Sequence, residues 1–386
     1  MKFFIYTMTL FMLFFSACRL KDAQVTPVGE PLPYNGPSQT VKQLLDGSGF
    51  TIYKAIWKKV NMDSVISANG LQAYTLLVPA DEAFTKAGVT LAAVNTMPVA
   101  DLDSLLFYHV VDTWLSGDQL KTLTGSNAMR SLLTRGDLPN YSDRFPYYYY
   151  QYLGLHDGKL VINGKPHPLK TLEGTNGTLY VLDELLKKPE QDMIDYLKNN
   201  PDFSMLMEAC RINDSIYQLN WGSQGFTKLL STDANSKQFT FFAPTNHAFQ
   251  QAGFNTVDDL RQRALRWEVG YQHYDENGYY VTPYTSLDSM FLSNHLDYSG
   301  ATQAEYPMQL FSNDLMDNPA LANYLIKAGS LYHPPSQYIR LVFTHSAAGI
   351  MVRQLNSPSP AVPLATTDLL FRNGVIHVIN DGMLMP

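Results

Sequence analysis

The chain has 386 residues, which is enough for two ordinary domains. Hydrophobic residues make up 45% and charged residues 16%, a composition that can bury a core and excludes wholesale disorder. The net charge of −7 excludes a general attraction to nucleic acid, and two cysteines, Cys18 and Cys210, leave little room for an intramolecular disulfide framework.

Residues 1–17 predict an export signal. Lys2 precedes an uncharged run, Phe3–Phe15, which is shorter than the about 20 residues that span a bilayer and is typical of the apolar core of a signal peptide. Ser16 and Ala17 then precede Cys18, an order that resembles a bacterial lipoprotein signal, in which the cysteine becomes the lipid-modified N-terminus. An ordinary cleaved signal with an incidental cysteine is the alternative.

Residues 18–38 predict a lipidated cysteine followed by a tether. The segment Ala23–Ser38 is rich in proline, which favours an extended polyproline conformation of about 3.1 Å per residue. We therefore expect a folded part held off a membrane by a lipid anchor. The expected location is the bacterial outer membrane, with cell-surface or periplasmic exposure left open.

Helical segments are predicted before the first strand of each half of the chain. Thr40–Lys59 carries apolar residues at helical spacing, from Val41 to Trp57. In the second half, Pro189 can start a helix with Met193, Ile194 and Leu197 on one face, and Pro201-Asp202 can open another that carries Cys210 on its apolar side. We expect Cys210 to be a buried core thiol.

The remainder of the chain is an internal repeat. Ala73–Val89 and Gln238–Phe254 share the pattern T-x3-P-x3-A-F-x2-A-G. Each predicts a buried strand, Tyr74–Val78 or Phe239–Ala243, which a proline ends. A helix follows in each copy.

The helix after each strand has the same predicted ends. Asp81 or Asn246 is expected to cap a helix by accepting from its free N–H groups. Phe84 and Phe249 are expected to point into the core. Gly88 and Gly253 supply the left-handed position that ends a helix.

Two further segments also recur. Leu105–Val111 (LLFYHVV) and Phe291–Leu296 (FLSNHL) each contain a histidine, His109 or His295. Gly177–Pro189 and Gly374–Pro386 each read as a glycine turn, an apolar strand and a final proline.

These motifs, in this order and twice over, resemble the fasciclin domain over about residues 39–386. The resemblance implies an α+β fold with two tandem domains, each a wedge of two small β-sheets with packed helices. The boundary is expected near Lys187–Glu190, which gives domain 1 as 39–188 and domain 2, with insertions, as 189–386. One insertion lies around Arg263–Leu287, where Glu276-Asn277-Gly278 predicts a hairpin turn between aromatic residues.

Catalysis finds little support in the sequence. There is no GxSxG, HExxH, P-loop or GxGxxG motif, and no two of the nine histidines have the helical spacing of metal ligands. We expect no enzyme activity, no cofactor and no metal.

The candidate partner-binding residues fall into three groups. Tyr108-His109 is the motif that the resemblance connects with adhesion, although a histidine within an apolar run favours a core residue whose ring nitrogens tie a strand to a loop. His295 and His377 receive the same structural interpretation. The other groups are two aromatic tracts, whose members are Tyr147, Tyr148, Tyr149, Tyr150, Trp267, Tyr271, Tyr279 and Tyr280.

The four consecutive tyrosines, Tyr147–Tyr150, cannot all face one core, because side chains alternate along a strand. They are either an ordinary wet strand edge or a surface for a sugar ring or a protein. Two functions follow. The chain is either a membrane-anchored adhesion protein that binds a protein or matrix partner, or a glycan-binding lipoprotein accessory to outer-membrane polysaccharide uptake. No nucleic-acid partner is expected.

Overall fold

The computed structural model describes residues 36–138, 146–221, 226–231, 239–265, 273–274, 280–281, 287, 296–297, 309–317, 325–328, 337–347 and 349–385. Pro37–Pro386 form one compact unit. Within the described ranges, no helix is both long enough and apolar enough to cross a bilayer. The export signal, Cys18 and most of the tether lie outside the described residues and stay predictions.

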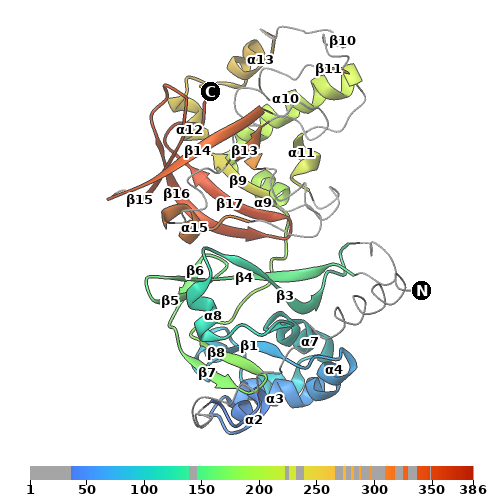
Figure 1. The fold of residues 1–386 in the computed structure, drawn as a ribbon. Helices are drawn as coiled ribbons and strands as arrows, with labels where there is room; N and C mark the ends of the chain where they lie inside the picture. The colour runs from blue at the N-terminus through green and yellow to red at the C-terminus, as the bar shows by residue number, and fades with distance from the viewer. Residues whose placement is uncertain are drawn as a thin grey trace, which may run out of the picture. The chain divides into compact units, whose positions relative to one another are not determined.

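The first repeat, from α2 to β8, mixes helices and strands (Figure 1). Its helices are α2 (Val41–Asp46), α3 (Thr51–Val60), α4 (Met62–Ala68), α5 (Asp81–Lys86), α6 (Leu91–Thr96), α7 (Val99–Tyr108) and α8 (Gly117–Thr122). Its strands are β1 (Tyr74–Pro79), β2 (Val110–Val111), β3 (Asn127–Thr134), β4 (Tyr148–His156), β5 (Lys159–Ile162), β6 (Lys165–His167), β7 (Thr171–Gly174) and β8 (Gly177–Leu182).

The second repeat, from α9 to β17, has the same mixed character. Its helices are α9 (Met193–Asn199), the 3-10 helix η1 (Pro201–Phe203), α10 (Ser204–Trp221), α11 (Phe226–Leu229), α12 (Asn246–Gln251), α13 (Val257–Leu265) and α15 (Ser312–Asp317). Its strands are β9 (Phe239–Pro244), β10 (His273–Tyr274), β11 (Tyr280–Val281), β12 (Leu296–Asp297), β13 (Leu325–Ala328), β14 (Gln337–Ser346), β15 (Gly349–Gln354), β16 (Val362–Phe371) and β17 (Gly374–Ile379). The expected α+β class is confirmed.

Each repeat is centred on a parallel pair of strands. In the first repeat β1 pairs with β8 from Tyr74↔Gly177 to Pro79↔Leu182, and in the second β9 pairs with β17 from Phe239↔Gly374 to Pro244↔Ile379. Every residue of these four strands is buried. Burial on both faces explains why the segments read in the sequence as continuous apolar runs rather than alternating ones.

The two sheets grow from this centre in opposite directions. The strand order is β6-β5-β4-β3-β2-β1-β8-β7 in the first repeat and β12-β9-β17-β16-β15-β14-β13 in the second. Strand β3 pairs with β2 through Ser131 and with β4 across a register shift, so it joins two smaller sheets. Strand β16, which pairs with β17 across two register shifts and also with β15, does the same in the second repeat.

The register identifies equivalent histidines. Strand β2, directly after His109, pairs Val110 with Leu76 of β1, and β12, directly after His295, pairs Leu296 with the equivalent residue of β9, Phe241. His295 itself lies outside the described residues. The strand that follows it nevertheless has the register that the sequence comparison predicts.

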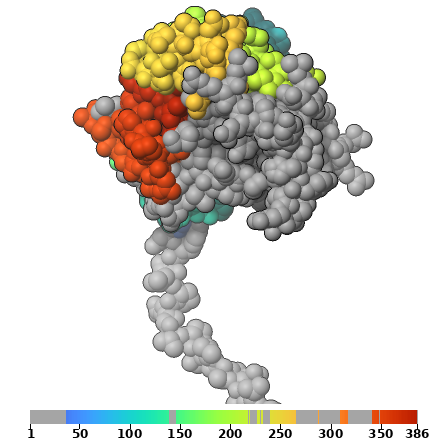
Figure 2. Space-filling model, turned by 90° about the horizontal axis from the view of Figure 1, so that it is seen from above, coloured from blue at the N-terminus to red at the C-terminus, as the bar shows by residue number. Residues whose placement is uncertain are grey.

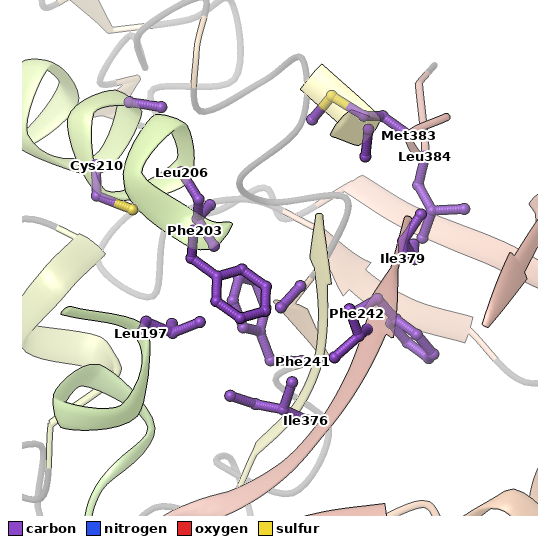
Figure 3. Packing of buried hydrophobic residues seen from close by; sticks show 14 of the residues in the cluster. Leu197, Phe203, Leu206, Cys210, Phe241, Phe242, Ile376, Ile379, Met383 and Leu384 are labelled. Atoms are coloured by element: carbon purple, nitrogen blue, oxygen red, sulfur yellow. The ribbon is translucent and has the colours of Figure 1, made fainter. Parts of the chain in front are cut away.

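Helices cover the central strands and form the two main cores. In the first repeat, residues of α3 and α7 pack with Leu76 of β1 and Leu179 of β8. In the second, Phe203 and Leu206 extend from η1 and α10 towards β9 and β17 (Figure 3). On the outer surface, α12 and α13 (yellow) lie next to the C-terminal strands (red) in Figure 2. Phe84, Phe249 and Cys210 are fully buried, as predicted.

Two expectations of secondary structure are wrong. His109, expected on a strand, directly follows helix α7, whose buried residues Leu102 and Leu106 are one helical turn apart, and only Val110–Val111 form a strand. Helix α9 begins at Met193 and not at Pro189. Asp192 is held in extended conformation and pairs with Arg372, which delays the helix.

Candidate functional site

Tyr108 and His109 are buried at the junction of α7 and β2. Tyr108 is 1% exposed and His109 is 0% exposed. The two rings meet edge to face at 6.2 Å, and the other side of Tyr108 meets Tyr149 of β4 at 5.9 Å. In this conformation neither ring is accessible to a partner from the surface.

His109 ties a helix to the segment after β8. Its Nε2 accepts from the Leu186 N–H at 3.1 Å, so Nδ1 carries the proton and donates to the Leu105 carbonyl at 2.8 Å. Burial lowers the pKa of His109 to about 4, which keeps the ring neutral. The structural interpretation of this histidine is confirmed, except that the nitrogens join a helix, and not a strand, to the loop.

His377 has the same kind of role in the second repeat. It is fully buried in β17, and its Nε2 donates to the Leu310 carbonyl at 2.8 Å while Nδ1 accepts from the Asp368 N–H at 3.4 Å. Burial also lowers the pKa of this ring. Both histidines therefore satisfy backbone groups inside the fold.

The tyrosine tract Tyr147–Tyr150 lies at the start of β4, and all four residues are half-buried. The guanidinium of Arg130 lies 4.7 Å from the ring centre of Tyr148, and that of Arg135 lies 5.5 Å from Tyr149. The alternation that the sequence predicts is present. Tyr149 faces Tyr108 of its own repeat, whereas Tyr150 packs with residues of the second repeat.

A small cavity lies where the tract meets the second repeat. It is lined by Tyr108 and the β4 tyrosines on one side and by Leu370, Phe371 and Arg372 on the other. Its volume is about 30 Å³. A cavity needs about 10–15 Å³ to hold one water, so this one has room for about two waters.

The second aromatic tract is mostly outside the described residues. Trp267, Tyr271 and Tyr279 fall there, and only the backbone of Tyr280, in β11, is described. Strands β10 and β11 pair antiparallel, with His273 opposite Val281, which confirms the hairpin predicted around Asn277-Gly278.

One set of hydrogen bonds recurs in both repeats and was not predicted from the sequence; in each repeat it holds the backbone N–H and carbonyl of one leucine, and we call it the bracket. Thr75 Oγ1 accepts from the Leu115 N–H at 2.8 Å, and Tyr180 Oη donates to the Leu115 carbonyl at 3.0 Å. In the second repeat the Leu310 N–H donates to Thr240 Oγ1 at 3.0 Å, and His377 binds the Leu310 carbonyl. Leu115 and Leu310 are therefore equivalent, and the shared pattern L-x-[GS]-[DN]-x-L was the signal that could have shown it.

Each bracket leads into a short helix whose first N–H is bound by a carboxylate from a neighbouring strand. In the first repeat Gly117 N donates to Glu173 Oε1 at 2.8 Å. In the second, Ser312 N donates to Asp368 Oδ1 at 2.7 Å. Carboxylates are favoured at helix N-termini, so both repeats use the same device to fix α8 and α15.

Asp81 and Asn246 cap a helix, but not the one that follows them. Asp81 accepts from the N–H groups of Thr51 and Ile52, at the start of α3, both at 3.0 Å. Asn246 Oδ1 accepts from Met205 N at 2.8 Å, at the start of α10. The tertiary fold brings these distant helix ends to the strand exit, which the sequence alone does not reveal.

Asp81→Ala is expected to lower the free energy of unfolding by about 1–2 kcal/mol, because two N–H groups of α3 lose their acceptor. Asp81→Asn is the matched variant, since the second repeat uses asparagine at the equivalent place, and it should lose less stability because its one amide oxygen still accepts from one of the two N–H groups. Urea unfolding of both variants measures the difference. Equal losses would contradict the cap.

The described residues show little that resembles a catalytic or metal site. Among them, no three His, Cys, Asp or Glu side chains are grouped as metal ligands. His167 Nδ1 lies 2.7 Å from Asp183 Oδ1, an arrangement found in catalytic triads. Its Nε2 is buried and has no hydrogen-bond partner among the described residues.

A comparison with protein families gives a match for the first repeat. Residues 48–188 match the family model described as Fasciclin domain. The fasciclin-like nature of the first repeat is therefore confirmed. The second repeat shares the parallel central pair, the strand after the histidine and the bracketed short helix with the first.

Two curated relatives are similar over a short stretch. They are the transforming growth factor-beta-induced proteins ig-h3 of Oryctolagus cuniculus and Sus scrofa, 31% and 32% identical over 103 residues. The match covers 25% of this chain and 13% of either relative, so the chain spans only a small part of their length. Among solved structures, a FAS1 domain pair from the insect cell adhesion molecule Fasciclin I matches with 15% identity and a TM-score of 0.34, over 88% of this chain and 98% of that one.

Proposed function

We propose that this protein is a lipid-anchored adhesion protein that binds a protein or matrix partner without catalysis. Cys18 carries the anchor and the proline-rich segment is the tether, at the bacterial outer membrane. The observation that supports the proposal most is the fasciclin match of residues 48–188, followed by a second repeat with the same central framework.

The use of polar side chains in the described residues fits a scaffold. His109, His377, Asp81 and Asn246 all bind backbone groups of their own repeat, as set out above. Groups engaged in this way position helices and loops, and they do not converge on a pocket as catalytic groups do. The surface, rather than an interior site, is then the part that a partner meets.

Cell adhesion with and without the anchor tests the proposal. Cells that carry the full chain should adhere to surfaces coated with matrix proteins, and cells that carry Cys18→Ala should not, because that protein is released. The purified Pro37–Pro386 unit should bind the same coating and compete with the cells. Adhesion that is equal with and without Cys18 would contradict the anchor, and a Pro37–Pro386 unit that binds no coating would contradict adhesion.

Glycan binding is the second candidate, and one exposed residue favours it. Trp114 is 38% exposed, and its Nε1 donates to Thr178 Oγ1 at 3.0 Å, while Thr178 donates to Glu173 Oε2 at 2.7 Å. A fixed indole face suits stacking on a sugar ring. Binding to polysaccharide that is lost in Trp114→Ala, and kept in the exposed control Leu91→Ala, would favour this function over adhesion.

A further inference from the structure

We infer that the tyrosine tract is the docking surface for the second repeat of the same chain, and that this contact holds the two repeats as one binding body. Tyr150 and Tyr152 are then occupied by the second repeat and are not a site for an external sugar or protein. The inference concerns the pair of repeats and does not depend on adhesion being the function.

The centre of the contact is apolar. Tyr152 of β4 packs on Phe311 with ring centres 5.2 Å apart, and Val375 completes the buried cluster. Tyr150 and Leu370 pack against its edge. We call these five residues the seam. Three of them are at most 3% exposed, and separating the repeats would expose these apolar side chains to water.

Directional bonds surround the apolar centre on one side. Ser126 N donates to Asp314 Oδ1 at 2.5 Å, and Asn313 Nδ2 donates to Ser126 Oγ at 3.0 Å. The Asp314 carboxylate also accepts from Phe311 N at 2.8 Å. It is thus bound by one N–H from each repeat, which fixes the orientation of α15 against the turn before β3.

A charged cluster closes the other side. Arg135, which is 4% exposed, donates from Nη1 to the Arg372 carbonyl at 2.5 Å and pairs with Asp137 at 2.6 Å. Arg372 in turn pairs with Asp192 at 3.0 Å and lies 3.7 Å from Asp137. Two of these contacts cross between the repeats, the Arg135 bond to the Arg372 carbonyl and the approach of Arg372 to Asp137, and both would be lost if the repeats separated.

The close approach of one side chain to a glycine adds a steric requirement. A Cβ on Gly164, in the turn between β5 and β6, would overlap the side chain of Asp368 in the second repeat. Gly154 of β4 would bring a Cβ within 2.6 Å of the Gly125 carbonyl and 3.5 Å of Asn313 Nδ2. Gly164 therefore lets the two repeats fit, whereas the tight contact at Gly154 lies within the first repeat.

The first repeat supplies an internal comparison for the seam. Three residues of the seam, Phe311, Leu370 and Val375, belong to the second repeat. The bracket and the register of the central strands identify the equivalent positions in the first repeat. No seam forms there, and the corresponding residues are polar: Ser116 for Phe311, Thr178 for Val375 and Glu173 for Leu370. At these three positions the second repeat, which contacts β4, has apolar residues where the first repeat has polar ones. The sequence of the second repeat is thus adapted to the tyrosine tract.

The occupant of the tract follows from these contacts. Half of a strand of tyrosines must face away from its own core, and here Tyr150 and, further along β4, Tyr152 meet apolar residues of the second repeat, whereas Tyr148 lies against Arg130 of its own repeat. The cavity that remains has room for about two waters. We therefore expect a partner of the protein to bind elsewhere, on surfaces whose relative positions the seam fixes.

The variant Leu370→Glu tests the inference in the full chain. Leu370 is partly buried and packs with the seam cluster, so a carboxylate there should separate the repeats and leave each fold intact. We expect a larger radius of gyration by small-angle scattering and amide exchange of Ser126 that is about tenfold faster, as a loss of about 1.4 kcal/mol would give. Leu91→Glu, at a site that is already 46% exposed, is the control and should change neither.

A disulfide crosslink between the two repeats tests the same contact without relying on a variant that could be destabilised. Ser126→Cys with Asn313→Cys places two thiols where side chains now lie 3.0 Å apart, and mild oxidation should join them nearly completely without loss of helix or strand signal. Unchanged scattering and Ser126 exchange in Leu370→Glu, or a failure of the crosslink to form, would overturn the inference.

Discussion

Gly177→Ala is expected to unfold the first repeat at much lower denaturant than the wild type. Gly177 opens β8 directly opposite Tyr74, and a Cβ there would overlap the Tyr74 carbonyl oxygen, which belongs to the backbone of β1 and cannot move aside. The expected cost is about 3 kcal/mol, at the upper end of overpacking costs. Urea unfolding followed by tryptophan fluorescence measures it, since Trp57 is buried in this repeat.

Two variants show whether the cause is the close approach. Gly49→Ala has open space around the added Cβ and should cost little. Gly374→Ala meets the Phe239 carbonyl at the equivalent place in β17, with φ of 148°, and should destabilise the second repeat instead. If Gly177→Ala unfolds at the same urea concentration as Gly49→Ala, the close packing of the parallel pair is contradicted.

The stability of the protein is expected to fall as the pH drops from about 6.5 to 4, in part because of His109. Burial lowers the pKa of this ring from 6.5 to about 4, so below pH 6.5 the unfolded chain binds a proton that the native chain does not. The contribution is intact above pH 6.5 and is lost by about pH 4. Its size is about 3 kcal/mol, at 1.36 kcal/mol per pKa unit.

His109→Gln isolates this contribution. A glutamine can still donate towards the Leu105 carbonyl and accept from Leu186 N, but it does not titrate. The difference in unfolding free energy between pH 7 and pH 4 should therefore be smaller in His109→Gln than in the wild type. His377, whose pKa burial also lowers, remains in both proteins and supplies the residual histidine dependence. An identical pH dependence would show that His109 is not held neutral.

Local patterns predicted the parts of the fold that depend on neighbouring residues. The strands β1, β8, β9 and β17, the helices after β1 and β9, and the glycines that end those helices follow from apolar runs and from the conformational freedom of glycine. Gly88 and Gly253 have φ of 81° and 89°, as the pattern requires. The burial of His109 also follows from its apolar surroundings in the sequence.

Contacts between distant segments were the parts that the sequence misjudged. Asp81 looked like the cap of the helix that it begins, yet it caps α3, which ends at Val60. The equivalence of Leu115 and Leu310 was hidden because the chain between β12 and α15 is longer than that between β2 and α8. A hydrogen bond to a remote segment leaves no periodic signal in either segment.

The tyrosine tract marks the boundary between the two kinds of information. The sequence by itself determined that four consecutive tyrosines on a strand leave some rings facing away from their own core, because side chains alternate. Only the tertiary structure decided what those rings meet, since the apolar surface opposite them, at Phe311, Leu370 and Val375, is assembled from a helix cap and two strands of the other repeat. Alternation is a property of the local backbone, whereas a complementary surface exists only after distant segments have folded together.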